Sequence, residues 1–382
     1  MKKIINITHT DSDGVGCGIV RKFFGRISGH EVEVINCGYS AINNRVREII
    51  DRLPQEHESI AQVIISDISV KESSGVDKLI DQAAIDYPEV SFRLLDHHST
   101  SMWLNKYPWA YVKETDETLT KHCGTWLVYN MLHPVFEGCH VPGSAVLKEY
   151  VHVIDLYDTW RWIDDYQDDH FELANDLDRI MKIKGKDSFT EDMLKKMEGD
   201  PVYFDYKNKY PTSLIDPIDE TLIRYKGMEI ERQVESKEHE MAIGEYVFQV
   251  RTKNLLELVK QHFMTKYLDN PYALSNALKK WKLGSSQKFN VGVIYSTENI
   301  SEVGNILAVN HPELDFIMII AMPATISYRG VKDLEIPLGI IAADIGNGKG
   351  GGHDNASGSP LSKWKIKDVS TDLIHGLSIK QV

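Results

Sequence analysis

The sequence predicts an α/β protein: an N-terminal parallel-sheet domain with helices on both faces is joined by a helical connector to a smaller α/β domain. Three observations support this fold class. Short β-branched runs alternate with segments of helical period over the first hundred residues, strands return near residue 288, and 382 residues exceed what one core needs. We expect domains at 1–200 and 286–382, with a connector or insertion at 201–285.

The first domain begins with β-branched runs that indicate strands at 4–8, 32–37, 63–66 and 92–95. The segments between them have the period of helices, near 16–27, 41–53 and 72–86. Because parallel strands need a crossover long enough to hold a helix, this alternation predicts a parallel sheet. Helical patterns then dominate up to residue 200, including 122–132 and 145–160.

The segment after residue 200 is charged and opens with prolines, followed by a helical pattern. We interpret it as a connector, although an extension of the first domain is equally consistent with the pattern. The second strand-rich region has strand patterns at 289–295, 316–322 and 325–328 around a helix near 303–310. A glycine-dense loop at 346–352 follows.

The charge balance limits the classes of partner. The chain has 43 Lys and Arg against 56 Asp and Glu, a net charge of −13. Because clamping a long duplex requires clustered cations, this balance argues against such a protein and leaves short phosphorylated substrates open.

Neither a membrane segment nor a disulfide framework is indicated. No run of about 18 apolar residues exists, and the apolar stretch at Ile4 and Ile5 is far too short for a signal peptide, so we expect a cytoplasmic protein without membrane contact. The four cysteines form no Cys-x-x-Cys pair, which favours buried, reduced thiols. They are Cys17, Cys37, Cys123 and Cys139.

Clusters of Asp and His follow three of the expected strands, and a fourth lies on an expected helix. They are His9-Thr10-Asp11-Ser12-Asp13-Gly14, Ser66-Asp67, Asp96-His97-His98, and Asp155 with Asp158. Each has an ordinary structural interpretation, since an Asp after a strand is commonly a helix N-cap and a single His is commonly a hydrogen-bonded structural residue.

The convergence of these clusters favours chemistry. Parallel strands end at one edge of a sheet, which would bring several carboxylates and imidazoles together. Carboxylates a few ångströms apart repel one another, so such a cluster normally implies bound cations. Mixed carboxylate and imidazole ligands without thiolate point to Mn²⁺, with Mg²⁺, Co²⁺ or Fe²⁺ as alternatives, and the number of ligands suits two ions.

The four clusters, in this order and with Asp96-His97-His98 third, resemble the DHH phosphoesterase superfamily. Near the C-terminus, the nine residues from Gly350 to Gly358 resemble the GGGHxxAxG signature of the DHH-associated (DHHA1) domain, and Ser327-Tyr328-Arg329 resembles its S-x-R element. Because His9 precedes Asp11 by two residues, the spacing of this motif most resembles that of the oligoribonuclease (nanoRNase) and RecJ-like branch. His122 to Tyr129 also resembles the Gly-Thr helix of those proteins, and the segment 165–285 matches no part of the family.

The resemblance implies a catalytic domain with two Mn²⁺ ions. His9, Asp11 and Asp67 would hold one ion, and Asp13, Asp67 and His97 the other, with Asp67 bridging. A helical aspartate would complete the second site, for which Asp158 is preferred and Asp155 is the reserve. His98 would face the scissile phosphate, and Asp96 would orient a histidine.

The resemblance also implies that the second domain binds the end of the substrate. Its contacts would come from six residues: Arg329, Gly350, Gly351, Gly352, His353 and Ser357. Trp160, Trp162 and Tyr328 could stack on a base, although aromatic residues at these spacings are more often part of a core.

The implied activity is a metal-dependent phosphodiesterase that hydrolyses short RNA or DNA oligonucleotides to mononucleotides through a metal-bridging hydroxide. A homodimer is one assembly that the sequence allows, but the sequence does not fix the oligomeric state. The negative charge suits a pocket for a few nucleotides. One alternative is a RecJ-like exonuclease acting on longer single strands. Others are a phosphoesterase for cyclic or linear dinucleotides or 3′-phosphoadenosine 5′-phosphate, and a non-catalytic nucleotide-binding scaffold.

Overall fold

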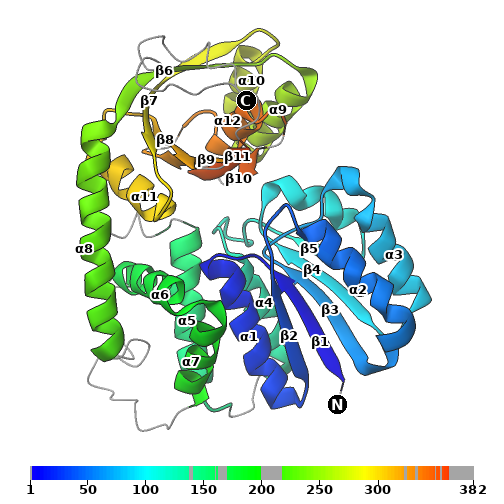
Figure 1. Ribbon diagram of the computed structural model, residues 1–382. Coiled ribbons are helices and arrows are strands. Elements are labelled where there is room, and N and C mark those ends of the chain that lie inside the picture. The colour runs from blue at the N-terminus through cyan, green and yellow to red at the C-terminus, as the bar shows by residue number, and fades with distance from the viewer. Residues whose placement is uncertain are drawn as a thin grey trace. The chain divides into compact units, whose positions relative to one another are not determined.

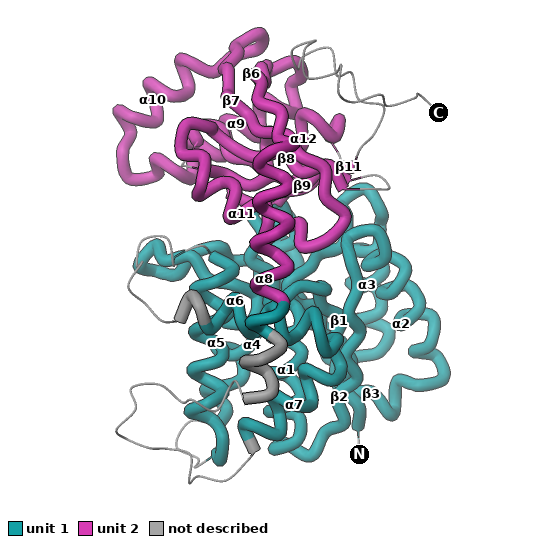
Figure 2. Tube along the Cα trace, turned by 60° about the vertical axis from the view of Figure 1, so that its left-hand side comes forward, with its two compact units in different colours: residues 1–225 teal, residues 226–382 magenta. Residues whose placement is uncertain are grey.

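The computed structural model describes residues 2–136, 141–159, 161, 170–198, 217–321, 325–331, 334–348, 350–352 and 355–360. The chain divides into two compact units, residues 1–225 and 226–382 (Figure 2). None of the helices in these ranges is long and apolar enough to cross a membrane.

The first unit is built on a five-stranded sheet in the order β2-β1-β3-β4-β5, and every pairing in it is parallel (Figure 1). Its strands are β1 (Lys3–Thr8), β2 (Glu31–Asn36), β3 (Ile60–Ser66), β4 (Ser91–Asp96) and β5 (Ala110–Val112). The four strands predicted from the sequence are confirmed, whereas the three-residue β5 was too short to give a periodic signal.

The described helices of this unit follow the strands or complete its helical part. They are α1 (Ser12–Ser28), α2 (Ile42–Glu56), α3 (Val76–Asp86), α4 (Gly124–Leu132), α5 (Ser144–Asp158), α6 (His170–Lys184) and α7 (Lys186–Glu198). Short 3₁₀ helices accompany them: η1 (His57–Ser59), η2 (Glu72–Ser74), η3 (Ser99–Lys106) and η4 (His133–Phe136).

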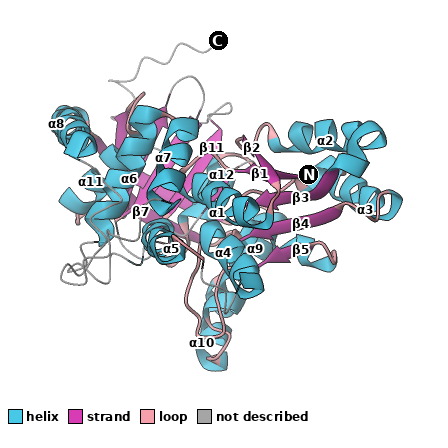
Figure 3. Cartoon of the chain, turned by 90° about the horizontal axis from the view of Figure 1, so that it is seen from below, coloured by secondary structure: helices cyan, strands magenta, loops and turns pink. Residues whose placement is uncertain are grey.

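Helices cover both faces of the sheet, as predicted (Figure 3). Successive residues of a strand point to opposite faces. Ile4 and Ile64 therefore pack into the core formed with α1 and α4 to α7, while Ile5 and Ile65 pack into the core formed with α2 and α3. This two-sided burial explains why the strands are almost continuously apolar.

The connection from β1 to α1 is a tight turn. Asp11 is the N-cap of α1, and its carboxylate accepts a hydrogen bond of 3.0 Å from the Gly14 N–H. A Cβ at Gly14 would collide with the backbone carbonyl of His9, so only glycine fits here. Because β1 lies between β2 and β3, the strand order reverses at this point, which is where ligands bind in open α/β sheets.

The second unit is built on a mixed six-stranded sheet in the order β10-β11-β9-β8-β7-β6, in which only β7 and β8 pair in parallel among the described residues. Its strands are β6 (Ala242–Gln249), β7 (Ser286–Tyr295), β8 (Phe316–Ala321), β9 (Thr325–Gly330), β10 (Gly351–Gly352) and β11 (Ala356–Pro360). The helices are α8 (Pro217–Glu240), which starts in the first unit, α9 (Lys253–Lys266), α10 (Pro271–Lys280), α11 (Ile300–Asn310) and α12 (Leu338–Ile345).

Three elements of the second unit, β6, α9 and α10, come from the segment 201–285 that the sequence left as a connector or insertion. β6 pairs with β7 along its whole length, and its Tyr246 and Phe248 enter the core of this unit. The strand pattern of β6 was hidden because its exposed side carries the apolar Ile243 as well as Glu245, so polar and apolar residues do not alternate clearly.

Candidate metal centre

His9 and Asp11 lie in the turn between β1 and α1. Their side chains are joined by a contact of 2.6 Å between His9 Nδ1 and Asp11 Oδ2. The Asn36 side chain at the end of β2 donates a 2.7 Å hydrogen bond to the His9 carbonyl and fixes the turn. One ring nitrogen of His9 lies within 4.8 Å of carboxylate oxygens of Asp11 and Asp67.

Asp13 occupies the first turn of α1 and is buried. Its two carboxylate oxygens accept hydrogen bonds from the N–H groups of Gly124 (2.7 Å) and Thr125 (2.6 Å) at the N-terminus of α4. Gly124 is required for this approach, because a Cβ there would lie 2.6 Å from Asp67 Cβ and 3.0 Å from Asp13 Oδ2. The Gly-Thr pair that begins α4 therefore holds Asp13 and leaves room for Asp67.

Asp67 follows β3 directly and is buried. Its φ of 54° lies in the left-handed region, which costs a non-glycine residue roughly 1–2 kcal/mol and is typical of functional sites. Asp67 Oδ1 lies 3.2 Å from His97 Nε2, while Oδ2 has no hydrogen-bond partner within the described part of the chain. Asp67 thus combines a strained backbone with a buried carboxylate oxygen, Oδ2, to which no described residue donates a hydrogen bond.

The tripeptide Asp96-His97-His98 ends β4. Asp96 Oδ1 accepts hydrogen bonds from the His97 N–H (2.9 Å) and from His98 Nδ1 (2.7 Å), and Ser69 donates to Oδ2. Burial lowers the pKa of His98, but the Asp96 carboxylate outweighs burial and raises that pKa above its ordinary value. Asp96 therefore contacts and orients His98, leaving His97 to face the neighbouring strands.

The two aspartates of α5 have different surroundings. Asp158 Oδ2 lies 3.6 Å from His97 Nε2 and has no hydrogen-bond partner among the described residues. Asp155 instead accepts hydrogen bonds from the Cys123 N–H (2.7 Å), from His122 Nδ1 (2.8 Å) and from Arg161. The structure brings Asp158 to the cluster and engages Asp155 in holding the N-terminus of α4.

Potential ligand atoms of these residues gather within 4.8 Å of one another in three overlapping groups. The groups are His9, Asp11 and Asp67; Asp13, His97 and Asp158; and Asp67, Asp96, His97 and His98. Burial, followed by the charge of Asp13, raises the pKa values of both Asp67 and Asp158 well above the ordinary range. Buried carboxylates that repel one another, with unsatisfied oxygens aimed inward, fit a site for divalent cations.

Tyr39 adds a side chain that the sequence did not single out. It follows β2, its hydroxyl lies 3.1 Å from His98 Nε2, and its ring centroid lies 5.0 Å from that of His9. Although the hydroxyl is hydrogen-bonded, 45% of the residue is exposed. The one signal for it in the sequence is its position just after a strand end, at the same edge as the acidic clusters.

In the second unit, Arg329 on β9 is nearly buried. Its guanidinium donates hydrogen bonds to Ser327 Oγ (2.7 Å), the Tyr328 carbonyl (2.8 Å) and Ser301 Oγ (2.6 Å). Tyr328 itself is completely buried and shares a 2.8 Å hydrogen bond with Ser359, so it belongs to the core and does not stack on a ligand.

The glycine motif is partly a strand. Gly351 and Gly352 form β10 and pair with β11, Gly352 facing Ser357. Gly350 lies directly against the backbone of Ala342, where a Cβ would not fit.

Four residues singled out from the sequence lie outside the described residues: His353, Trp160, Trp162 and Cys139. The other three cysteines, Cys17, Cys37 and Cys123, are buried and free, as expected.

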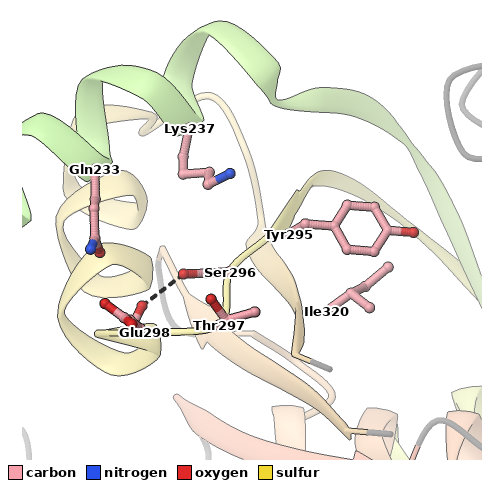
Figure 4. A pocket seen from close by; sticks show the side chains of 7 residues that line it. All are labelled: Gln233, Lys237, Tyr295, Ser296, Thr297, Glu298 and Ile320. Carbon is pink, nitrogen blue, oxygen red and sulfur yellow. Dashed lines mark hydrogen bonds between the residues drawn. The ribbon is translucent and has the colours of Figure 1, made fainter. Parts of the chain in front are cut away.

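A pocket of about 270 Å³ lies at the carboxyl ends of the parallel strands β7 and β8 (Figure 4). Figure 4 shows Lys237 and Gln233 entering it from α8, opposite the residues that follow β7. Its lining contains one ammonium group, on Lys237, and one carboxylate, on Glu298, so it has no clear preference for either sign of charge.

No protein-family model matches the chain. Two curated proteins are similar along most of its length. "Oligoribonuclease NrnB" of Bacillus subtilis (strain 168) is 25% identical over 358 residues, covering 93% of this chain and 72% of that protein. A "3′,5′-cyclic-nucleotide phosphodiesterase" of Helicobacter pylori is 21% identical over 372 residues, covering 96% of this chain and 94% of that protein.

Solved structures were also matched. An uncharacterized protein from Helicobacter pylori G27 is 19% identical with a TM-score of 0.45, and the match covers 96% of this chain and 95% of that chain. RecJ of Thermus thermophilus, in complex with Mn²⁺, is 13% identical with a TM-score of 0.47, and the match covers 95% of this chain and 50% of that chain.

Proposed function

We propose that the chain is a metal-dependent phosphodiesterase of the DHH phosphoesterase superfamily, to which its motifs and its two curated relatives point, and that it hydrolyses short oligonucleotides to mononucleotides. The observation that carries this proposal is the convergence of six ligand side chains from separate parts of the first unit. They are His9, Asp11, Asp13, Asp67, His97 and Asp158.

The ligands divide naturally into two cation sites that share Asp67. His9, Asp11 and Asp67 would hold one Mn²⁺, and Asp13, His97 and Asp158 would hold a second, with Asp67 bridging because its Oδ1 faces His97 and its Oδ2 is unsatisfied by the described residues. Two such ions, when bound, would lower the pKa of a water to supply the nucleophile and would offset charge on the phosphate oxygens.

The remaining polar side chains of this edge act on the substrate. Hydrolysis breaks one phosphorus–oxygen bond, adds a hydroxyl to phosphorus and adds a proton to the leaving oxygen. His98 is oriented by Asp96 through Nδ1, and its Nε2 lies 3.1 Å from the Tyr39 hydroxyl, so a protonated His98 would present its second proton at Nε2 beside Tyr39. We assign the delivery of that proton to the leaving oxygen to His98 and Tyr39 acting together.

The second unit would bind the end of the oligonucleotide. Arg329 is held by Ser327 and Ser301 in one orientation, which prepares its planar fork for a phosphate group. The backbone of Gly350 to Gly352, with His353 and Ser357, would add contacts to the terminal nucleotide.

A second candidate substrate is a cyclic nucleotide. It is favoured by the Helicobacter pylori relative, whose printed name is a 3′,5′-cyclic-nucleotide phosphodiesterase and whose similarity covers 94% of that protein. The same cation sites would serve either phosphodiester, since only the groups on both sides of the phosphorus differ.

One panel of substrates tests both candidates. Wild-type protein and Asp67→Ala are incubated with 2-mers, 5-mers, 20-mers, cyclic dinucleotides and 3′,5′-cyclic AMP, with and without Mn²⁺, and the products are separated by chromatography. We expect mononucleotides from the shortest oligomers, only with metal and only from wild type. Protein that binds the oligomers with Mn²⁺ present yet releases no product from any substrate would contradict the proposal and favour a scaffold.

A further inference from the structure

The segment that follows β6 and includes the first residues of β7 has a charge opposite to that of the whole chain. Residues 251–288 contain eight Lys and Arg against two Asp and Glu, a balance of +6 in a chain with a net charge of −13. This segment forms α9 and α10, which lie together in the second unit (Figures 1 and 2). The acidic overall composition therefore conceals a basic region.

Much of this positive charge is not neutralised. Four of the lysines are exposed and form no ion pair within the described part of the chain: Lys253, Lys266, Lys279 and Lys282. Three others do pair with carboxylates, Lys260 with Glu257, Lys280 with Glu335 and Lys288 with Glu245. Cations without such partners are available to a polyanion, since no ion pair has to break first.

α10 carries an exposed aromatic residue on the same face as one of these lysines. None of its residues is buried, and Tyr272 is 80% exposed. Lys279 follows Tyr272 by seven residues, two helical turns, so the two side chains share a face, and the exposed Ser275 and Asn276 lie between them. A base could stack on the tyrosine ring while the lysine contacts a phosphate.

We propose that this face of α10, together with the exposed Lys282 two residues beyond the end of the helix, binds single-stranded nucleic acid. Lysines alone would suit any polyanion. The exposed Tyr272, with amide and hydroxyl groups next to it, adds a ring on which a nucleotide base can stack. A surface that binds an acidic protein partner would not require such a ring. The inference rests on the proposed function, because it gives the second unit a surface for the class of molecule that the first unit would cleave.

The test measures binding of a fluorescent 20-mer of single-stranded RNA to the full chain by anisotropy, in EDTA so that cleavage is absent. We expect Tyr272→Ala to weaken binding about tenfold. The double variant Lys279→Glu/Lys282→Glu should also weaken it and should lower the slope of log K against log salt by about 1.4, since each single-strand phosphate contact contributes about 0.7.

Matched controls make the same chemical changes elsewhere. Tyr225→Ala removes an exposed tyrosine from α8, and Lys78→Glu/Lys148→Glu reverses two exposed charges on α3 and α5. These variants should bind the 20-mer like wild type. Equal binding of the 20-mer by wild type and the α10 variants would overturn the proposal. The proposal would also be overturned if a poly-glutamate peptide bound the protein as tightly as the RNA does, with an affinity that Tyr272→Ala leaves unchanged.

Cleavage of a dinucleotide with Mn²⁺ separates this inference from the proposed function. The α10 variants should cleave it at the wild-type rate. If no phosphodiester is ever cleaved but 20-mer binding still depends on Tyr272, the proposed activity fails and the binding surface stands. If dinucleotides are cleaved and the α10 variants bind the 20-mer normally, the surface fails and the activity stands.

Discussion

Asp155 and Asp158 lie three residues apart on α5, yet Asp155 is hydrogen-bonded to Cys123, His122 and Arg161, whereas Asp158 faces His97. One carboxylate holds the start of α4, and an oxygen of the other has no hydrogen-bond partner among the described residues and would be available to a metal ion. Their sequence spacing places them on the same side of a helix and cannot distinguish these roles.

This contrast predicts opposite effects on the metal-free protein. Asp155→Ala should lower the free energy of unfolding by about 3 kcal/mol, because it leaves buried donors without their acceptor. Asp158→Ala should leave stability unchanged or raise it, because it removes a buried carboxylate with raised pKa. Urea denaturation in EDTA measures both. Calorimetry with Mn²⁺ should then show about tenfold or greater loss of affinity for Asp158→Ala; equal losses for both variants would contradict the assignment.

Gly124→Ala should disrupt the centre without touching a ligand. The added Cβ would lie 2.6 Å from Asp67 Cβ, so either Asp67 or the start of α4 must move. We expect an intact fold by circular dichroism but loss of the thermal stabilisation that Mn²⁺ gives. Gly38→Ala is the matched control, since a Cβ there meets no atom within 4 Å. If Gly124→Ala keeps the full Mn²⁺ shift in Tm, the close approach of α4 has no functional role.

Tyr39 and His98 should behave as one unit. Tyr39→Phe removes the hydroxyl that contacts His98 Nε2 and keeps the ring. We expect a fall in kcat with little change in KM, and a double variant with His98→Asn that is no slower than His98→Asn alone. A double-mutant cycle measures this coupling. In the metal-free protein, Tyr39→Phe should also shift the ¹⁵N resonance of His98 Nε2. Additive losses, with no such shift, would show that the two residues act independently.

Arg329→Ala should act mainly on substrate binding. Because Arg329 belongs to the second unit and is held by Ser327 and Ser301, its loss should raise KM for an oligonucleotide about tenfold while kcat changes little. Arg329→Lys keeps the charge without the planar fork and should be intermediate. Steady-state kinetics on the 2-mer, with thermal unfolding to verify the fold, separates these effects. A large fall in kcat at unchanged KM would place Arg329 in the chemical step.

The sequence contained most of the first unit's architecture and cluster, because both depend on local signals. β-branched runs mark β1 to β4, and Asp67 and Asp96 stand directly at strand ends. Tyr39 was not identifiable, since a single aromatic residue in a loop has no distinctive neighbours. β6 and α10 were missed because β6 carries apolar residues on both faces and α10 buries none of its residues completely, and because packing there depends on partners distant in the chain.

The central claim is that Asp67 bridges two cations at the edge of the first sheet. Anomalous diffraction from crystals grown with Mn²⁺ tests it directly. We predict two manganese peaks about 3.5–4 Å apart, both bonded to Asp67, one also to His9 and Asp11 and the other to Asp13, His97 and Asp158. A single peak, or peaks bonded to other side chains, would contradict it.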